Sequence, residues 1–127
     1  MEVIMKIALL LVLPLMLAVC MAVPVLDRTL TAPGGDIAGL GYGGGYLWAL
    51  DWTTPNIFTT YKLDPLTGSI EDSWEYYQDD QRYLPRGLAY INGYVYMCVS
   101  REITGMYVAA HYFTEAGVYV AKFSINC

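Results

Sequence analysis

Apolar and polar residues alternate over short stretches of the chain after residue 23, which is the pattern of β-strands with one buried face. No window repeats with the period of a helix over a useful length. The sequence therefore predicts an all-β domain. The expected strands are 25–31, 37–42, 46–52, 57–63, 69–77, 87–91, 94–100 and 118–125, with an extra strand at 106–113.

One stretch of the chain occurs twice. Residues 39–51, GLGYGGGYLWALD, return in register as residues 87–99, GLAYINGYVYMCV. Both copies place glycine where a tight hairpin needs a positive φ angle, at Gly45 and at Gly93, and Asn92-Gly93 is a strong hairpin signal. A period of this length indicates one supersecondary unit that is repeated.

The repeat predicts the arrangement of the strands. With the four strands of the unit labelled A to D from residue 37, the chain reads D-A-B-C-D-A-B-C, as two four-stranded antiparallel blades of the β-propeller type. Repeat 1 spans about 25–77 and repeat 2 about 78–127. Tyr61-Lys62-Leu63 of the third strand is matched to Ala121-Lys122-Phe123, which implies an insertion between 101 and 117.

Four motifs follow one another in a characteristic order. They are Gly39-Leu40-x-Tyr42, YLWALD at 46–51, TYKLDPLTGSI at 60–70 and PRGLAY at 85–90. Together they resemble the secreted NHL/YVTN and glutaminyl-cyclotransferase-like β-propeller repeats. The resemblance implies a propeller fold, and the matched residues are those of turns and blade packing.

Propellers usually have four to eight blades, whereas this sequence carries two repeats. The resemblance therefore leaves two expectations open. In one, the chain is a subunit of a homo-oligomeric ring, a trimer or a tetramer. In the other, it is a truncated fragment of a larger propeller, such as an enzyme of the glutaminyl-cyclotransferase or lactonase type.

The N-terminus predicts export. Residues 7–26 form an uncharged apolar run behind Lys6, and the candidate cleavage sites lie after Ala22 and after Cys20. Cleavage after Ala22 makes 1–22 a signal peptide and 23–127 the domain, secreted or periplasmic. Two alternatives remain: a membrane anchor through 7–26, which would bring the only contact with a membrane, and lipidation at Cys20. All three place the domain outside the cytoplasm.

The net charge bears on the expected partners, and the cysteines bear on a possible disulfide. The net charge is −5 and no basic patch is found, so we expect no nucleic-acid partner. Once Cys20 has left with the signal peptide, Cys98 and Cys127 remain as an even pair in an oxidising compartment, where a disulfide between them is expected as one outcome.

No motif for catalysis, for a metal or for a cofactor is found in the sequence. His111 is the only histidine, and its flanks are β-prone, so a packing or surface role is expected for it. The aromatic residues are the remaining candidates, since a ring at the rim of a blade can stack on a sugar or a peptide. The candidate ligand-binding residues are Trp52, Trp74, Tyr76 and Tyr83.

These observations predict a non-catalytic binding or scaffold module that acts outside the cytoplasm, with a glycan or a protein as its ligand. A propeller enzyme is the rival class. Enzymes of that kind draw their active-site residues from several blades, and two repeats supply few.

Overall fold

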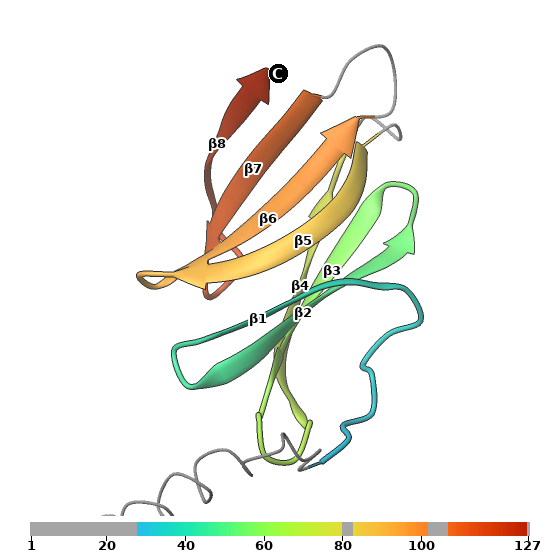
Figure 1. The fold of residues 1–127 in the computed structure, drawn as a ribbon, viewed down its shortest axis with the longest axis vertical. Coiled ribbons are helices and arrows are strands. Elements are labelled where there is room, and N and C mark those ends of the chain that lie inside the picture. Colours follow the sequence, from blue (N-terminus) through green and yellow to red (C-terminus); the bar gives the residue numbers. More distant parts are fainter. Residues whose placement is uncertain (1–27, 80–82, 102–106, 127) are drawn as a thin grey trace, which may run out of the picture.

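The computed structural model describes residues 28–79, 83–101 and 107–126. These residues form two four-stranded antiparallel sheets, which confirms the predicted fold class. Sheet 1 has the order β1-β2-β3-β4 and sheet 2 the order β5-β6-β7-β8, and Figure 1 shows one above the other with β1 facing β5. The strands are β1 (Ile37–Gly43), β2 (Tyr46–Thr54), β3 (Ile57–Leu63), β4 (Ile70–Tyr77), β5 (Tyr83–Ile91), β6 (Tyr94–Arg101), β7 (Tyr107–Thr114) and β8 (Tyr119–Asn126).

The first hairpin of each sheet closes through a two-residue turn. Gly44 and Gly45 have φ angles of 63° and 84°, and Asn92 and Gly93 have φ angles of 51° and 85°. Two successive positive φ angles define the turn whose twist matches that of antiparallel strands, and glycine adopts them without a steric penalty. Both predicted hairpins are therefore confirmed.

The two sheets share one pairing register. Leu47 pairs with Leu63 in sheet 1 and Val95 pairs with Phe113 in sheet 2, so β7 is the counterpart of β3, with Phe113 in the place of Leu63. The expected match of Leu63 to Phe123 is therefore wrong. The predicted extra strand at 106–113 is the third strand of the repeat, and the predicted third strand at 118–125 is the fourth.

The predicted strand at 25–31 is not found in the described residues. Residues 28–32 are not in a strand, and residues 25–27 lie outside the described part of the chain, as do the predicted signal peptide at 1–22 and Cys20. The fourth strand of each repeat instead follows its third strand through a short turn and pairs with it. Each sheet therefore reads A-B-C-D in the described residues, and the predicted order that begins with D is corrected.

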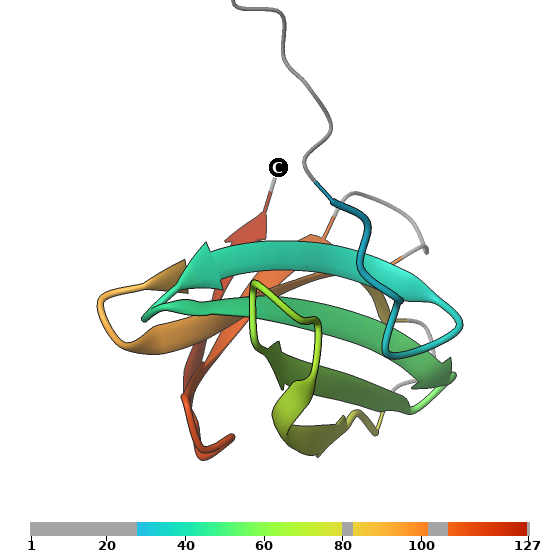
Figure 2. The ribbon, with the colours of Figure 1, turned by 90° about the horizontal axis from the view of Figure 1, so that it is seen from below.

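The sheets meet through the backbones of β1 and β5. A Cβ atom on Gly39 would lie 2.6 Å from the backbone nitrogen of Leu88 and 2.8 Å from the Cα atom of Gly87, so only glycine permits this approach. Figure 2 shows sheet 1 in front of sheet 2 in a view from below. We call the two facing surfaces the inner faces and the opposite surfaces the outer faces.

The core lies between the inner faces. Trp48 and Leu50 of sheet 1 and Val95 and Met97 of sheet 2 have no exposed surface. Tyr46, Trp52, Trp74, Tyr76, Tyr83 and Tyr90 pack against this core.

Part of the outer face of sheet 1 is covered by the segment that precedes β1. Buried Asp51 accepts hydrogen bonds from the backbone N–H of Asp36 (2.8 Å) and from the hydroxyl of Thr53 (3.1 Å), and so holds the end of this segment. A cavity of about 240 Å³ remains under the segment. It is lined by Leu30, Thr31, Ala32, Pro33, Ile37, Leu40, Leu47 and Leu63.

Candidate functional site

The four aromatic residues that the sequence singles out all border the inter-sheet core. Trp52 lies on β2, Trp74 and Tyr76 on β4, and Tyr83 at the start of β5, and each is partly buried against the core. The indole N–H groups of Trp52 and Trp74 are buried and meet no acceptor in the described part of the chain. These positions fit packing, and the ligand-binding role of the four residues stays a prediction.

The structure joins two of these residues to sheet 2 in one aromatic cluster. The ring centroid of Phe113 lies 4.7 Å from that of Trp74 and 5.0 Å from that of Tyr76. Tyr119 of β8 stacks on Tyr76 with an interplanar angle of 7° and meets Phe113 edge-on. Such offset and edge-on pairs add stability beyond their buried area, so this cluster helps to hold the far strands of the two sheets together.

His111 lies within the same cluster. Its Nδ1 atom is 3.2 Å from the hydroxyl oxygen of Tyr76, and its side chain is almost fully buried. Burial, with a smaller effect of Lys122, lowers the pKa of His111, while burial and the nearby Tyr119 and Asp79 raise the pKa of Tyr76. Both groups are therefore neutral near pH 7, which suits a packed hydrogen bond better than proton transfer.

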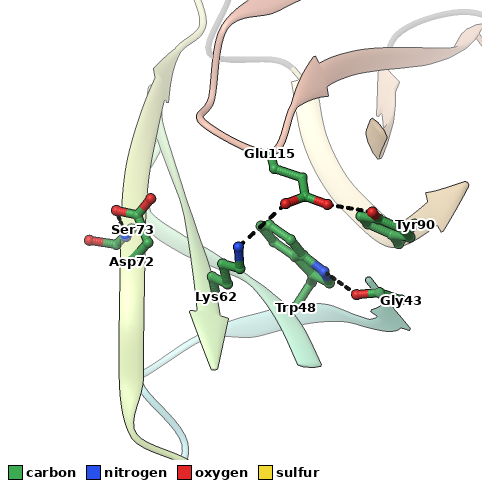
Figure 3. Close-up of polar contacts among 7 residues, drawn as sticks. All are labelled: Gly43, Trp48, Lys62, Asp72, Ser73, Tyr90 and Glu115. Carbon is green, nitrogen blue, oxygen red and sulfur yellow. Dashed lines mark hydrogen bonds and ion pairs between the residues drawn. The ribbon is translucent and has the colours of Figure 1, made fainter. Parts of the chain in front are cut away.

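A polar bridge crosses between the sheets at the β7–β8 turn. The carboxylate of Glu115 accepts a short hydrogen bond from the hydroxyl of Tyr90, and its other oxygen lies 3.4 Å from Nζ of Lys62 (Figure 3). The Lys62 ammonium lies 4.0 Å from the ring centroid of Tyr46 and 5.4 Å from that of Trp48. The cation is therefore held between an anion and two aromatic rings.

Trp48 and Tyr90 form the floor of this bridge. Their rings stack with centroids 5.8 Å apart, and the indole N–H of Trp48 donates to the carbonyl of Gly43 at 3.1 Å (Figure 3). A Cβ atom on Gly43 would overlap the Tyr90 ring, so glycine makes room for the tyrosine. The floor of the bridge thus depends on the same glycine-rich strand that permits the close approach of the sheets.

The electrostatics of the bridge are those of a satisfied ion pair. The hydrogen bond from Tyr90 and then Lys62 lower the pKa of Glu115, and the same hydrogen bond raises the pKa of Tyr90. The carboxylate is thus ionised and the phenol neutral near pH 7. A carboxylate with two donors already bound is a structural link between the sheets rather than a general acid or base.

Four neighbouring aromatic rings lie on the outer face of sheet 2, and we call them the aromatic platform. Tyr96 and Tyr112 stack with ring centroids 5.2 Å apart, Tyr94 meets Tyr112 edge-on at 5.8 Å, and Phe123 lies 5.8 Å from Tyr112. Phe123 is 49% exposed and Tyr94 is 38% exposed. The platform therefore presents a continuous aromatic surface built from β6, β7 and β8.

This surface is not among the sites predicted from the sequence. Matching Lys62 to Lys122 in the sequence assigns the third and fourth strands of the second repeat to the wrong segments. Tyr112 and Phe123 lie in these segments. Once β7 is paired with β6, Tyr112 lies opposite Tyr96. The sequence does contain one indication of this surface. Ala110 and Tyr112 are two residues apart, so they lie on the same face of a strand.

The thiol of Cys98 lies on the same face. Cys98 pairs with Ala110 in the ladder between β6 and β7, which puts it beside the aromatic platform. Cys127 lies outside the described residues, so the disulfide between these two cysteines stays a prediction.

The described residues hold no cluster of metal ligands. In 28–79, 83–101 and 107–126, no three His, Cys, Asp or Glu side chains are grouped so that they could hold a metal ion. Within these same ranges no helix has the length and the apolar character that crossing a membrane requires. Comparison of the sequence with protein-family models and with curated proteins finds no match.

Proposed function

We propose that this protein is a non-catalytic binding or scaffold module of the β-propeller type that acts outside the cytoplasm, and that it binds through the aromatic platform. The observation that carries the proposal is the cluster of four aromatic rings on the outer face of sheet 2. Contiguous exposed apolar surface of this kind is typical of interaction sites. Tyrosine and phenylalanine also bring a large contact area with few rotatable bonds.

The surroundings of the platform favour a protein ligand over a glycan. The strand register places small apolar residues, Ala89, Ala110 and Ala121, on the same face, and Ile91 at its edge is half exposed. A sugar site needs polar side chains that bind hydroxyl groups and fix their orientation. An apolar protein surface needs only shape and aromatic contact, which this face supplies.

Export and family are supported by the sequence. The apolar run at 7–26 behind Lys6 favours transport out of the cytoplasm. The motifs that resemble NHL/YVTN and glutaminyl-cyclotransferase-like repeats fit a chain whose two sheets each have four antiparallel strands in sequential order.

The proposal is tested by selecting ligands from a displayed peptide library and from a glycan array. We expect peptides to be selected, and we expect Tyr112→Ser to weaken their binding about tenfold or more, because central aromatic residues dominate binding energy. Tyr77→Ser is the matched control, since Tyr77 is an exposed tyrosine on sheet 1.

Three results would contradict the proposal. Ligands that bind the native protein and Tyr112→Ser equally well would exclude the platform as the binding surface. Selected glycans in place of peptides would exclude the protein ligand. Turnover of a small cyclic ester or of an N-terminal glutamine would favour the rival enzyme class.

A further inference from the structure

We propose that the aromatic platform receives the outer face of sheet 1 from a second copy of this chain, so that chains associate head to tail. This inference rests on the proposed function, because it names the partner of the same binding surface. It follows from the internal repeat, which makes the interface between the two sheets of one chain a template for the interface between two chains.

The outer face of sheet 2 is the repeat counterpart of the inner face of sheet 1. Trp48 pairs with Lys62 on β3, and Tyr96, its counterpart in the second repeat, pairs with Tyr112 on β7. Further out, Thr60 pairs with Trp74, and Ala110 pairs with Phe123. The correspondence therefore extends across the strands of both sheets.

Aromatic rings recur at the corresponding positions of these two faces. Tyr94 corresponds to Tyr46, Tyr96 to Trp48, and Phe123 to Trp74. In sheet 1 these rings pack against sheet 2 as part of the core or its border. In sheet 2 they form the exposed platform, so the platform has the composition of a sheet face that receives another sheet.

The outer face of sheet 1 is the repeat counterpart of the inner face of sheet 2, which packs against sheet 1 within the chain. Leu88 packs on Gly41, and a Cβ atom on that glycine would lie 2.9 Å from a methyl carbon of Leu88. The counterpart of Leu88 is Leu40, which is 60% exposed, and the counterpart of Tyr90 is Tyr42, which is 66% exposed. Sheet 1 therefore exposes two of the side chains whose counterparts pack in sheet 2. The rest of this face is partly covered by the segment before β1, where Leu63, the counterpart of Phe113, is buried, so the second copy would contact the uncovered part.

Gly87 supplies an independent observation. At its counterpart Gly39 the close backbone of β5 requires glycine, whereas a Cβ atom on Gly87 would meet nothing within 4 Å, and the φ angle of Gly87 is not positive. The ladder between β5 and β6 has a register shift between Pro85 and Gly87, but the φ angle of Gly87 is open to other residues, so no contact within the described part of one chain requires glycine here. If the backbone of β1 from a second copy approaches as β5 approaches Gly39, the absence of a side chain is explained.

The charges at the two interfaces agree with this docking. Within the chain, Lys62 pairs with Glu115 across the sheets. The counterpart of Lys62 on the platform is Tyr112, and the counterpart of Glu115 in the turn after β3 is Pro65. Both partners of the ion pair are replaced together, so the proposed contact leaves neither half of this pair buried without the other.

The two interfaces also differ in one respect. Gly41 and Gly43 correspond to Ala89 and Ile91, so the groove that admits Tyr90 is partly filled on the platform. Tyr42 of the second copy would therefore lie over Ile91 rather than sink beside β5. Because the two docking faces are different surfaces, the contact is heterologous, and it gives a closed ring or an open chain depending on the rotation between copies.

The test uses two variants of the full chain, each with one face blocked, in a nonionic detergent that keeps residues 7–26 in solution. Gly87→Val blocks the platform and Leu40→Glu blocks the outer face of sheet 1. The matched controls are Gly35→Val, at a glycine with nothing within 4 Å of its Cβ position, and Leu66→Glu, at a leucine that is 66% exposed. Sedimentation velocity measures the mass of each sample and of the mixture.

We expect the native chain and both controls to associate and each blocked variant to lose affinity about tenfold or more. An equimolar mixture of the two blocked variants should form a one-to-one dimer and nothing larger, because each retains the face that the other lacks. Association through residues 7–26 would be the same in all samples and sets the baseline.

The inference is overturned if the native chain sediments no faster than the blocked variants, or if the mixture sediments as its components do. A mixture that stays at the baseline while Gly87→Val still loses peptide binding would reject the second copy as partner and keep the proposed function. Equal peptide binding by Gly87→Val and by the native chain, with no dimer in the mixture, would reject both.

Discussion

Trp48 and Tyr96 occupy the same place in their two repeats, yet Trp48 has no exposed surface and Tyr96 is partly exposed on the outer face of sheet 2. The strands around them have the same register and the same turn. The difference arises because sheet 2 covers the inner face of sheet 1, while the described residues place no such cover over the platform. Burial is therefore set by the position of a sheet in the stack and not by its own sequence pattern.

The largest difference in stability is expected between alanine variants of Trp48 and Tyr96. Trp48→Ala should lower the free energy of unfolding by about 3–5 kcal/mol, because it removes a fully buried ring and leaves a cavity. Tyr96→Ala should lower it by about 1 kcal/mol, since it loses mainly the stacking on Tyr112. Denaturant unfolding in dilute solution measures both values, and equal losses would contradict the assignment of inner and outer faces.

A smaller difference in stability is expected between substitutions of the equivalent glycines, Gly39 and Gly87. Gly39→Ala should destabilise the fold by about 1–3 kcal/mol, because its Cβ atom would lie 2.6 Å from the backbone of β5. Gly87→Ala should leave stability unchanged or slightly raised, since alanine restricts the unfolded chain more than glycine does. The difference between their denaturation midpoints is the measurement, and a destabilised Gly87→Ala would contradict the open space at this position.

The two sheets also differ at His111, because its counterpart in sheet 1 is Tyr61, whose side chain is a phenol rather than an imidazole. Burial lowers the pKa of His111 below its ordinary value of 6.5. The unfolded chain then binds more protons below pH 6.5, so the free energy of unfolding falls as the pH drops through this region. His111 is the only histidine, so His111→Phe should remove this slope, and an unchanged slope would contradict its burial.

The smallest effect concerns the ion pair that sheet 1 makes and the platform lacks. The hydrogen bond from Tyr90 lowers the pKa of Glu115 from 4.5, so its contribution to stability is present above pH 4.5 and is lost as the pH falls through the lower, folded-state value. Thermal unfolding at several pH values should show a weaker acid dependence for Glu115→Gln than for the control Glu75→Gln. Equal curves for the two variants would indicate that the bridge does not stabilise the fold.

Much of the candidate site could not be predicted from the sequence. The shared parity of Tyr94 and Tyr96 is visible in the repeat, but Tyr112 and Phe123 are displaced when Lys122 is matched to Lys62. The third strands of the two repeats, IFTTYKL and YVAAHYF, share no residue at corresponding positions. Only the hydrogen-bonded register identifies them as counterparts, and the platform becomes visible through that register.

The local structure can be predicted from the sequence alone. It consists of the alternation that makes strands, the turns at Gly44-Gly45 and Asn92-Gly93, and the repeat of the unit. These features depend on φ angles and on side-chain parity, which act over a few residues. Which copy of each aromatic residue is buried, and which glycine contacts a neighbouring backbone, depends on the tertiary structure. Those outcomes depend on which face another sheet covers, and that contact joins residues of different repeats, such as Gly39 and Leu88, that lie far apart in the chain.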